Sequence, residues 1–326
     1  MTLKMALALN VFSTGADRFC PQGYREPLKL QERISAASKL KGIEAIELDQ
    51  SDVTSELPTK DLKRMLKDYN LICSAVSANL AQDPRFALGA FGNQHQKTRN
   101  AAIDEGRKAV DIARALGSTN VTIRLYTDGF DYPFQVDYGA HWNTVISSIK
   151  TIAKYASPDI NVAIAYKPRE PRKHLTVATV GKSLSLCQEI AMKNVGVAMN
   201  LQQDMNAGKN PTQYNALLTR ENKRFQVYVS DGYRQWDDGM VPGGLHMWEL
   251  MEALFYLKTA KHKGYVTIDM LSDRMDPNHA CQIAIGNLSI FWKKLERLDV
   301  AELRKAQKTL DAVESQKIIR RVMLQG

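Results

Sequence analysis

Short apolar runs alternate with amphipathic helical patterns along nearly the whole chain. The runs cover residues 5–12, 42–48, 71–79, 120–126, 161–166, 195–201, 224–230 and 264–270. Apolar runs of this length, bounded by polar or turn residues, are typical of buried strands. The pattern therefore predicts eight strands.

Between these runs, apolar residues recur at helical spacing. The predicted helices cover residues 28–40, 59–67, 97–116, 142–155, 181–192, 211–218, 247–260 and 277–298. Strands that alternate with helices form parallel sheets with right-handed crossovers. Eight such units favour an α/β fold of one closed (β/α)8 barrel, a TIM barrel, over an open doubly wound sheet. No GxGxxG follows the first run and no GxxxxGK[ST] occurs, which weakens both nucleotide-binding alternatives.

One further helix is predicted after the barrel. Leu303, Ala306, Leu310, Val313 and Ile318 recur at helical spacing within residues 300–324. We therefore divide the chain into a barrel over residues 1–298 and a C-terminal helical extension over residues 299–326. The extension could cover the barrel exterior or form an oligomer contact.

The segment NVAIAYKPREPRKH, residues 161–174, combines a predicted strand with a charged loop that Pro168 and Pro171 punctuate. Charge at the carboxyl end of a strand is where α/β folds place ligand sites. Lys167 and Glu170 could be a base and its partner, or a structural ion pair. Arg169 and Arg172 could bind an anionic group, or form salt bridges at the rim.

Polar residues also follow the sixth, seventh and eighth strands. Amide, hydroxyl and aromatic groups suit a polyhydroxylated ligand, because they offer directional hydrogen bonds and a stacking face. The candidate catalytic residues are Lys167, Glu170, Asp231, Asp269 and His246. The candidate substrate-binding residues are Arg169, Arg172, Asn200, Gln203, Tyr228, Tyr233, Arg234 and Trp236.

Composition and charge limit the classes of binding partner that this chain is expected to have. The net charge of +9 is spread over helical segments that also carry Asp and Glu, without the basic stripe of nucleic-acid binders. No run approaches the roughly 18 apolar residues of a membrane span. Four cysteines without CxxC spacing indicate a reducing compartment. We expect a cytoplasmic protein with a small-molecule ligand and no nucleic-acid or membrane partner.

Six segments together resemble the xylose-isomerase-like TIM-barrel family of sugar isomerases and epimerases. They are DPRFALGAFGN, DGFDYPFQVDY, YKPREPR, VGVAMNLQQDMNAGKNP, DGYRQWDDGM and HMWELMEAL, within a similarity that runs from about residue 7 to about residue 285. The resemblance implies a manganese, magnesium or zinc ion at the ends of the fifth to eighth strands, held by Glu, Asp, His and a further acidic residue. Such an ion polarises sugar oxygens while carboxylates move a proton.

Most positions that the resemblance assigns to the metal carry other residues here. Ala165 stands where the family has Glu, Asn200 where it has Asp, and Gln203 where it has His. The seventh-strand positions are Gln226 and Tyr228, and only Asp269 keeps its ligand chemistry. A hard dication needs anionic oxygen or imidazole donors. We therefore expect no metal cofactor at the inherited position.

Three functions remain open. The first is a barrel that binds a sugar or sugar-derived ligand and has lost the metal site, so that it is inactive or a metal-independent isomerase, epimerase or lyase. The second is a non-catalytic subunit, a pseudoenzyme in a homo-oligomer or paired with an active paralogue; the resemblance extends to subunits of C-glycoside-cleaving complexes. The third is a metal-dependent isomerase with displaced ligands, for example Asp204, Asp231, His246 and Asp269.

Overall fold

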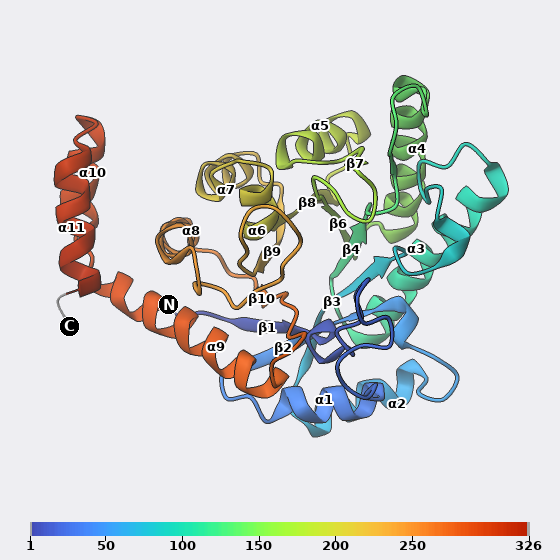
Figure 1. Ribbon diagram of the computed structural model, residues 1–326, viewed down its shortest axis with the longest axis horizontal. Coiled ribbons are helices and arrows are strands. Elements are labelled where there is room, and N and C mark those ends of the chain that lie inside the picture. Colours follow the sequence, from blue (N-terminus) through green and yellow to red (C-terminus); the bar gives the residue numbers. More distant parts are fainter. Residues whose placement is uncertain (1, 325–326) are drawn as a thin grey trace.

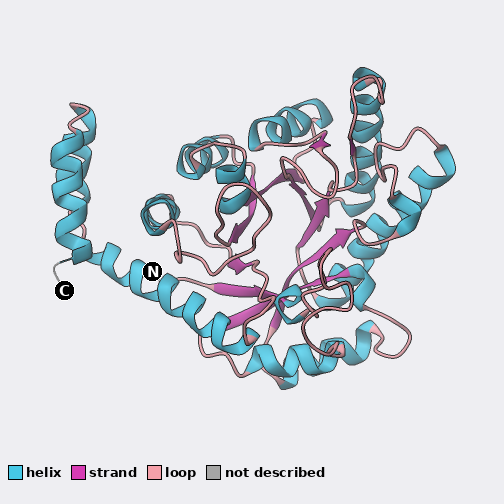
Figure 2. Cartoon of the chain, viewed as in Figure 1, coloured by secondary structure: helices cyan, strands magenta, loops and turns pink. Residues whose placement is uncertain are grey.

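The structure is a computed structural model that describes residues 2–324. Eight parallel strands close into a barrel, with the helices outside it (Figure 2), which confirms the predicted fold. Around the barrel the strands are β1 (Met5–Ala8), β2 (Ile43–Asp49), β3 (Ile72–Asn79), β4 (Asn120–Arg124), β6 (Asn161–Ala165), β8 (Val195–Asn200), β9 (Arg224–Val229) and β10 (Val266–Ile268).

Eight of the helices follow the strands in the predicted order (Figure 1), and a short helix over residues 201–206 was not predicted. The helices are α1 (Leu30–Ser38), α2 (Thr59–Asp68), α3 (Gln96–Leu116), α4 (Tyr138–Ala156), α5 (Val180–Ile190), α6 (Leu201–Asn206), α7 (Pro211–Arg220), α8 (Met247–Thr259), α9 (Pro277–Lys294), α10 (Val300–Lys308) and α11 (Ala312–Leu324). Within residues 2–324, no helix has the length and apolarity that crossing a membrane requires.

Burial of the strands in the core explains why they could be predicted from the sequence. Strand residues such as Leu7, Ile46, Val76 and Ile123 are fully buried and belong to one large hydrophobic cluster. Strands of a parallel barrel lie beneath a layer of helices, so their sequences are nearly continuous apolar runs. Residues that break these runs with charge therefore stand out as functional candidates.

Two local features at the carboxyl ends of the strands differ from the predicted pattern. The first predicted strand ends at Ala8 and continues as the 3-10 helix η1 (Leu9–Phe12), which brings Asn10 to the barrel mouth. A small antiparallel sheet pairs β5 (Gly129–Phe130) with β7 (His174–Leu175). A Cβ at Gly129 would lie 2.1 Å from the carbonyl oxygen of His174, so this pairing requires glycine.

The prediction of a single C-terminal helix over residues 300–324 was wrong. The chain forms α10 and α11 instead, which lie side by side at the end of α9 (Figure 1). They pack on the outside of the barrel, where the Arg304 guanidinium of α10 lies 5.5 Å from the centre of the Phe255 ring of α8 and Leu303 and Ile318 belong to the main hydrophobic cluster. Leu310 adopts a positive φ of 54°, which ends the first helix. The Asp311 carboxylate then accepts a hydrogen bond from the Glu314 backbone N–H at 2.8 Å and caps the second helix. Residues 325 and 326 of the predicted extension lie outside the described residues.

Candidate functional site

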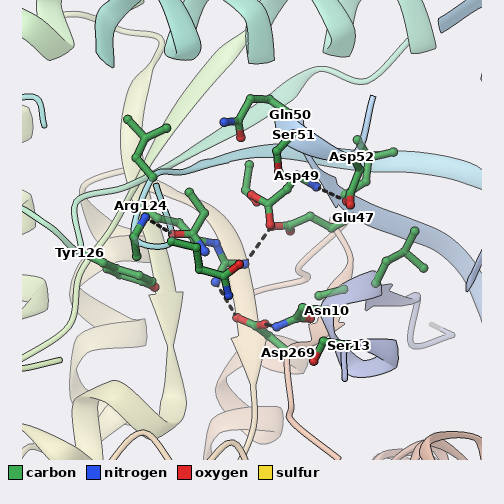
Figure 3. A pocket seen from close by; sticks show the side chains of 18 of the residues that line it. Asn10, Ser13, Glu47, Asp49, Gln50, Ser51, Asp52, Arg124, Tyr126 and Asp269 are labelled. Carbon is green, nitrogen blue, oxygen red and sulfur yellow. Dashed lines mark hydrogen bonds and ion pairs between the residues drawn. The ribbon is translucent and has the colours of Figure 1, made fainter. Parts of the chain in front are cut away.

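The barrel mouth holds a cavity of about 660 Å³ (Figure 3). It opens at the carboxyl ends of the strands, where parallel barrels place their ligand sites. Its volume lies within the range of about 300–1,000 Å³ that is typical of small-molecule sites. Its lining includes side chains from η1, β2, β4 and β8 and from the segments after β6, β9 and β10.

Arg124, the last residue of β4, lies at the centre of this cavity between two carboxylates (Figure 3). Its Nη2 lies 3.1 Å from Oε1 of Glu47, and its Nη1 lies 3.2 Å from Oδ2 of Asp269. Asn10 donates a hydrogen bond from Nδ2 to the other Asp269 oxygen at 3.0 Å. The exposed fractions of the three charged side chains are 10% for Arg124, 1% for Glu47 and 7% for Asp269. We call Glu47, Arg124 and Asp269 the central cluster.

Burial shapes the protonation of the groups around the cavity. Desolvation raises the pKa of Glu47 to about 7, although Arg124 opposes this shift. Desolvation likewise raises the pKa of Asp49, two residues further along β2, to about 6. Burial opposes the charge of Arg124, but the neighbouring Asp269 and Glu47 hold its pKa well above the ordinary value. The cavity thus contains a permanent cation beside carboxyl groups that titrate near neutral pH.

Aromatic rings fill the space beside Ala165. Ala165 pairs with Arg124 across β4 and β6, and it belongs to a small buried cluster with Ala198, Tyr126 and Tyr228. The Arg124 guanidinium lies 5.3 Å from the centre of the Tyr228 ring and 5.9 Å from that of Tyr126. These distances allow cation–π attraction. Alanine at position 165 therefore leaves room for tyrosine rings that pack against a resident cation.

The Tyr228 hydroxyl joins the central cluster to the barrel interior. It lies 2.8 Å and 2.7 Å from the two Glu47 carboxyl oxygens, and 2.7 Å from the Thr122 hydroxyl. Tyr228 was a candidate for substrate binding, but its side chain is buried beneath Glu47 and does not line the cavity.

A second charged cluster forms one wall of the cavity. Lys167 Nζ lies 2.6 Å from Oδ2 of Asp237 and 4.0 Å from Oε2 of Glu170. Gln203 donates from Nε2 to the other Asp237 oxygen at 2.6 Å, and the Asp237 backbone N–H donates to Glu170. Asp237 belongs to the loop after β9, so this loop folds over the ends of β6 and β8. Lys167 therefore pairs with Asp237, and Asp269 with Arg124.

Asp231 and His246 form a separate pair that does not line the cavity. The Asp231 carboxylate accepts hydrogen bonds from the backbone N–H groups of Leu245 and His246, and its Oδ1 lies 2.7 Å from His246 Nδ1. Arg234 donates to His246 Nε2 at 3.0 Å and pairs with Glu249. These contacts organise the loop after β9 and the start of α8.

The other candidate binding residues also lie apart from the cavity lining. Arg172 pairs with Asp131 at 2.6 Å, and Arg169 donates to the backbone carbonyl of Gln235. Tyr233 and Trp236 are exposed on the loop after β9. Of the candidate residues, the structure places Lys167, Asn200, Gln203 and Asp269 in the cavity lining.

Sequence reasoning missed the residues from the first half of the barrel. Glu47 and Arg124 each place a charge inside a predicted strand, in IEAIELD and NVTIRLY. A charged residue in an otherwise apolar buried strand needs a partner, and this was the signal that could have found them. Asp49 directly follows the predicted strand over residues 42–48, so charge at the carboxyl end of a strand could have found it, whereas Asn10 and Tyr126 carried no comparable signal.

The side chains at the inherited metal position do not fit a divalent cation. Ala165 offers no donor, and the Asn200 side-chain oxygen accepts a hydrogen bond from the Gln203 backbone N–H as the cap of α6. Asp269 faces a guanidinium instead of an open coordination site. Among residues 2–324, no three His, Cys, Asp or Glu side chains gather in a way that could hold a metal ion. Asp204, Asp231, His246 and Asp269 therefore do not form a displaced site in this structure.

Comparisons with known proteins agree with the fold. The xylose isomerase from Thermus thermophilus is 25% identical over 173 residues, which cover 52% of this chain and 45% of that protein. The chain thus spans less than half the length of this relative. The 3-keto-D-glucoside 4-epimerase from E. coli superposes with a TM-score of 0.67 at 14% identity, covering 88% of this chain and 99% of that one. D-allulose 3-epimerase from Methylomonas sp. gives a TM-score of 0.66 at 15% identity, with coverage of 90% and 96%.

The sequence also matches a family as a whole. Residues 34–288, which include seven of the eight barrel strands, match the family described as xylose isomerase-like TIM barrel. The closed eight-stranded barrel is the architecture that this description names. The chain belongs to the xylose isomerase-like TIM barrel family.

Proposed function

We propose that the protein binds a sugar or a sugar-derived ligand in the cavity at the barrel mouth, without the divalent metal of its family. The observation that carries this proposal is the central cluster, in which Arg124 holds two carboxylates inside a polar cavity. Solved relatives with the same fold include a D-allulose 3-epimerase crystallised with D-allulose and a D-psicose 3-epimerase crystallised in the presence of D-fructose. Their names support a sugar as the ligand class.

Any turnover would be metal-independent isomerase, epimerase or lyase chemistry by proton transfer. Glu47 and Asp49 line the cavity with pKa values raised to about 7 and about 6, so each could accept or return a proton near neutral pH. Lys167 and Asp269 would bind and orient ligand hydroxyls. Glu170 supports Lys167 through Asp237. Asp231 and His246 remain candidates only if the loop after β9 rearranges on binding.

Saturation-transfer NMR with D-allulose and D-fructose tests the proposal in buffer that contains EDTA. The variants Lys167→Met and Asp269→Asn should each weaken binding, because both side chains line the cavity. Lys173→Met is the matched control, since Lys173 is exposed on the same loop and does not line the cavity. If neither cavity variant changes binding, the ligand site lies elsewhere.

A second candidate function is a non-catalytic subunit that assembles with a paralogue or with a second copy. The observation in its favour is three exposed apolar side chains in the C-terminal segment: Leu310 in the turn between α10 and α11 is 89% exposed, and Val313 and Leu324 of α11 are 66% and 64% exposed. Val313 and Leu324 lie near opposite ends of α11, so a partner would have to contact this helix along its length. Sizing chromatography coupled to light scattering tests this function. A monomer at micromolar concentration would argue against self-association, and co-elution with an active paralogue would support the hetero-oligomer.

A further inference from the structure

We infer that Arg124 is the resident cation of the barrel mouth, and that its guanidinium binds an oxygen of a neutral sugar in the role that a metal ion would otherwise have. The identity of the ligand rests on the proposed sugar-binding function. The assignment of Arg124 as the cation does not depend on that function. It differs from the loss of a metal site alone, because it assigns a replacement.

The first argument is the coordination of Arg124. Its two terminal nitrogens bind one carboxylate each, from Glu47 and Asp269, and these two residues come from β2 and from the end of β10. A divalent ion would require the same arrangement, with anionic oxygens from different strands converging on one positive centre. Each terminal nitrogen carries a second N–H group that its carboxylate does not take, so the guanidinium can still donate to a ligand.

The second argument is packing. Ala165 is the register partner of Arg124, and Ala198 is the register partner of Ala165 on the next strand. The Tyr126 and Tyr228 rings, which cluster with these alanines, face the guanidinium. A longer side chain at position 165 would compete with these rings for space. The alanines, the rings and the cation therefore form one packing arrangement.

The third argument concerns the charge of the ligand. Four of the five cationic side chains that line the cavity, Arg33, Arg85, Arg124 and Lys167, already lie within 3.2 Å of a carboxylate. The fifth, Lys108, is exposed on α3. An anionic ligand would add negative charge to a cavity whose inner cations are all neutralised, which is unfavourable at low dielectric. We therefore assign a neutral sugar, held through a carbonyl or hydroxyl oxygen, over a sugar phosphate or a sugar acid.

The inference is tested by titrating Mn²⁺ into the wild type and into Arg124→Ala by calorimetry. Removing the guanidinium leaves Glu47 and Asp269 facing one space, together with a buried Asn10 Oδ1 that has no hydrogen-bond partner among residues 2–324. We expect Arg124→Ala to bind Mn²⁺ at least tenfold more tightly than the wild type. Adding Asp269→Asn to Arg124→Ala should abolish the gain. Arg33→Ala is the matched control, because Arg33 also loses an ion pair but releases only one carboxylate, Asp52.

Two results would overturn the inference. The first is that the wild type binds Mn²⁺ as tightly as Arg124→Ala does. The second is that Arg124→Ala folds but has no higher affinity for Mn²⁺ than the wild type. Should Arg124→Ala fail to fold, Arg124→Gln provides the same test, because it removes the charge but keeps polar bulk. The proposed sugar-binding function fails separately, through the absence of a sugar signal with the wild type. Weaker binding of D-allulose than of D-allulose 6-phosphate would contradict the assignment of a neutral ligand.

Discussion

Replacing Arg124 by methionine should destabilise the protein strongly. The substitution keeps an apolar stem of similar length but removes the charge between Glu47 and Asp269, which are 1% and 7% exposed. Breaking a buried ion pair by removing one partner costs about 3–5 kcal/mol. With an unfolding entropy of about 2.1 cal/mol/K per residue, this loss lowers the Tm of a chain of this size by about 4–7 °C. Thermal unfolding followed by circular dichroism at pH 7.5 measures it.

The loss of stability in Arg124→Met should depend on pH, which identifies Glu47 as its cause. Without the cation, the pKa of Glu47 should rise further above about 7, so the folded state binds protons that the unfolded state has released. Stability then falls as pH rises, and the loss is smaller at pH 5 than at pH 8. Arg85→Met is the control, because Arg85 also binds two carboxylates but its side chain is 59% exposed, and such pairs contribute at most about 1 kcal/mol. Equal losses in the two variants would refute the reasoning.

Three further predictions concern single side chains. Glu47 binds its proton more tightly in the folded state than in the unfolded state, so wild-type stability should fall between pH 5 and pH 8, and Glu47→Gln should make this fall smaller in urea unfolding. Glu44→Gln, on the exposed face of β2, should leave the pH profile unchanged. Burial raises the pKa of Asp204 well above its ordinary value, so Asp204→Asn should lower the free energy of unfolding by less than about 1 kcal/mol. Tyr166→Phe removes the hydroxyl that contacts Asp204 at 2.8 Å and should lower it by about 1–3 kcal/mol. A larger loss for Asp204→Asn than for Tyr166→Phe in chemical denaturation would contradict this prediction. Gly129→Ala should lower the Tm by overlap with His174, while Gly181→Ala, whose added Cβ meets its nearest atom at 3.8 Å, should not.

The fold could be predicted from the sequence because buried parallel strands leave continuous apolar runs. The break in the C-terminal helix was missed because Leu310 and Val313 continue the helical spacing across it, although Asp311 followed by Glu314 is a pattern typical of a helix start.

The site was predicted only in part. Charged residues after the strands were visible, and Lys167 and Asp269 do line the cavity. Glu47 and Arg124 were overlooked because they lie inside strands, and their pairing joins β2 to β4 across β3, between residues 77 positions apart. The contact between Asp231 and His246 depends on a loop that brings the Leu245 and His246 backbone N–H groups to one carboxylate, and spacing alone does not reveal this.

The central claim is that this barrel binds a sugar through its own charged residues and needs no metal. The most direct measurement is calorimetric titration of D-allulose and D-fructose into EDTA-treated protein, repeated with excess Mn²⁺. We predict that at least one of the two sugars binds, with an affinity that Mn²⁺ leaves unchanged. Binding that appears only after Mn²⁺ is added would contradict the account.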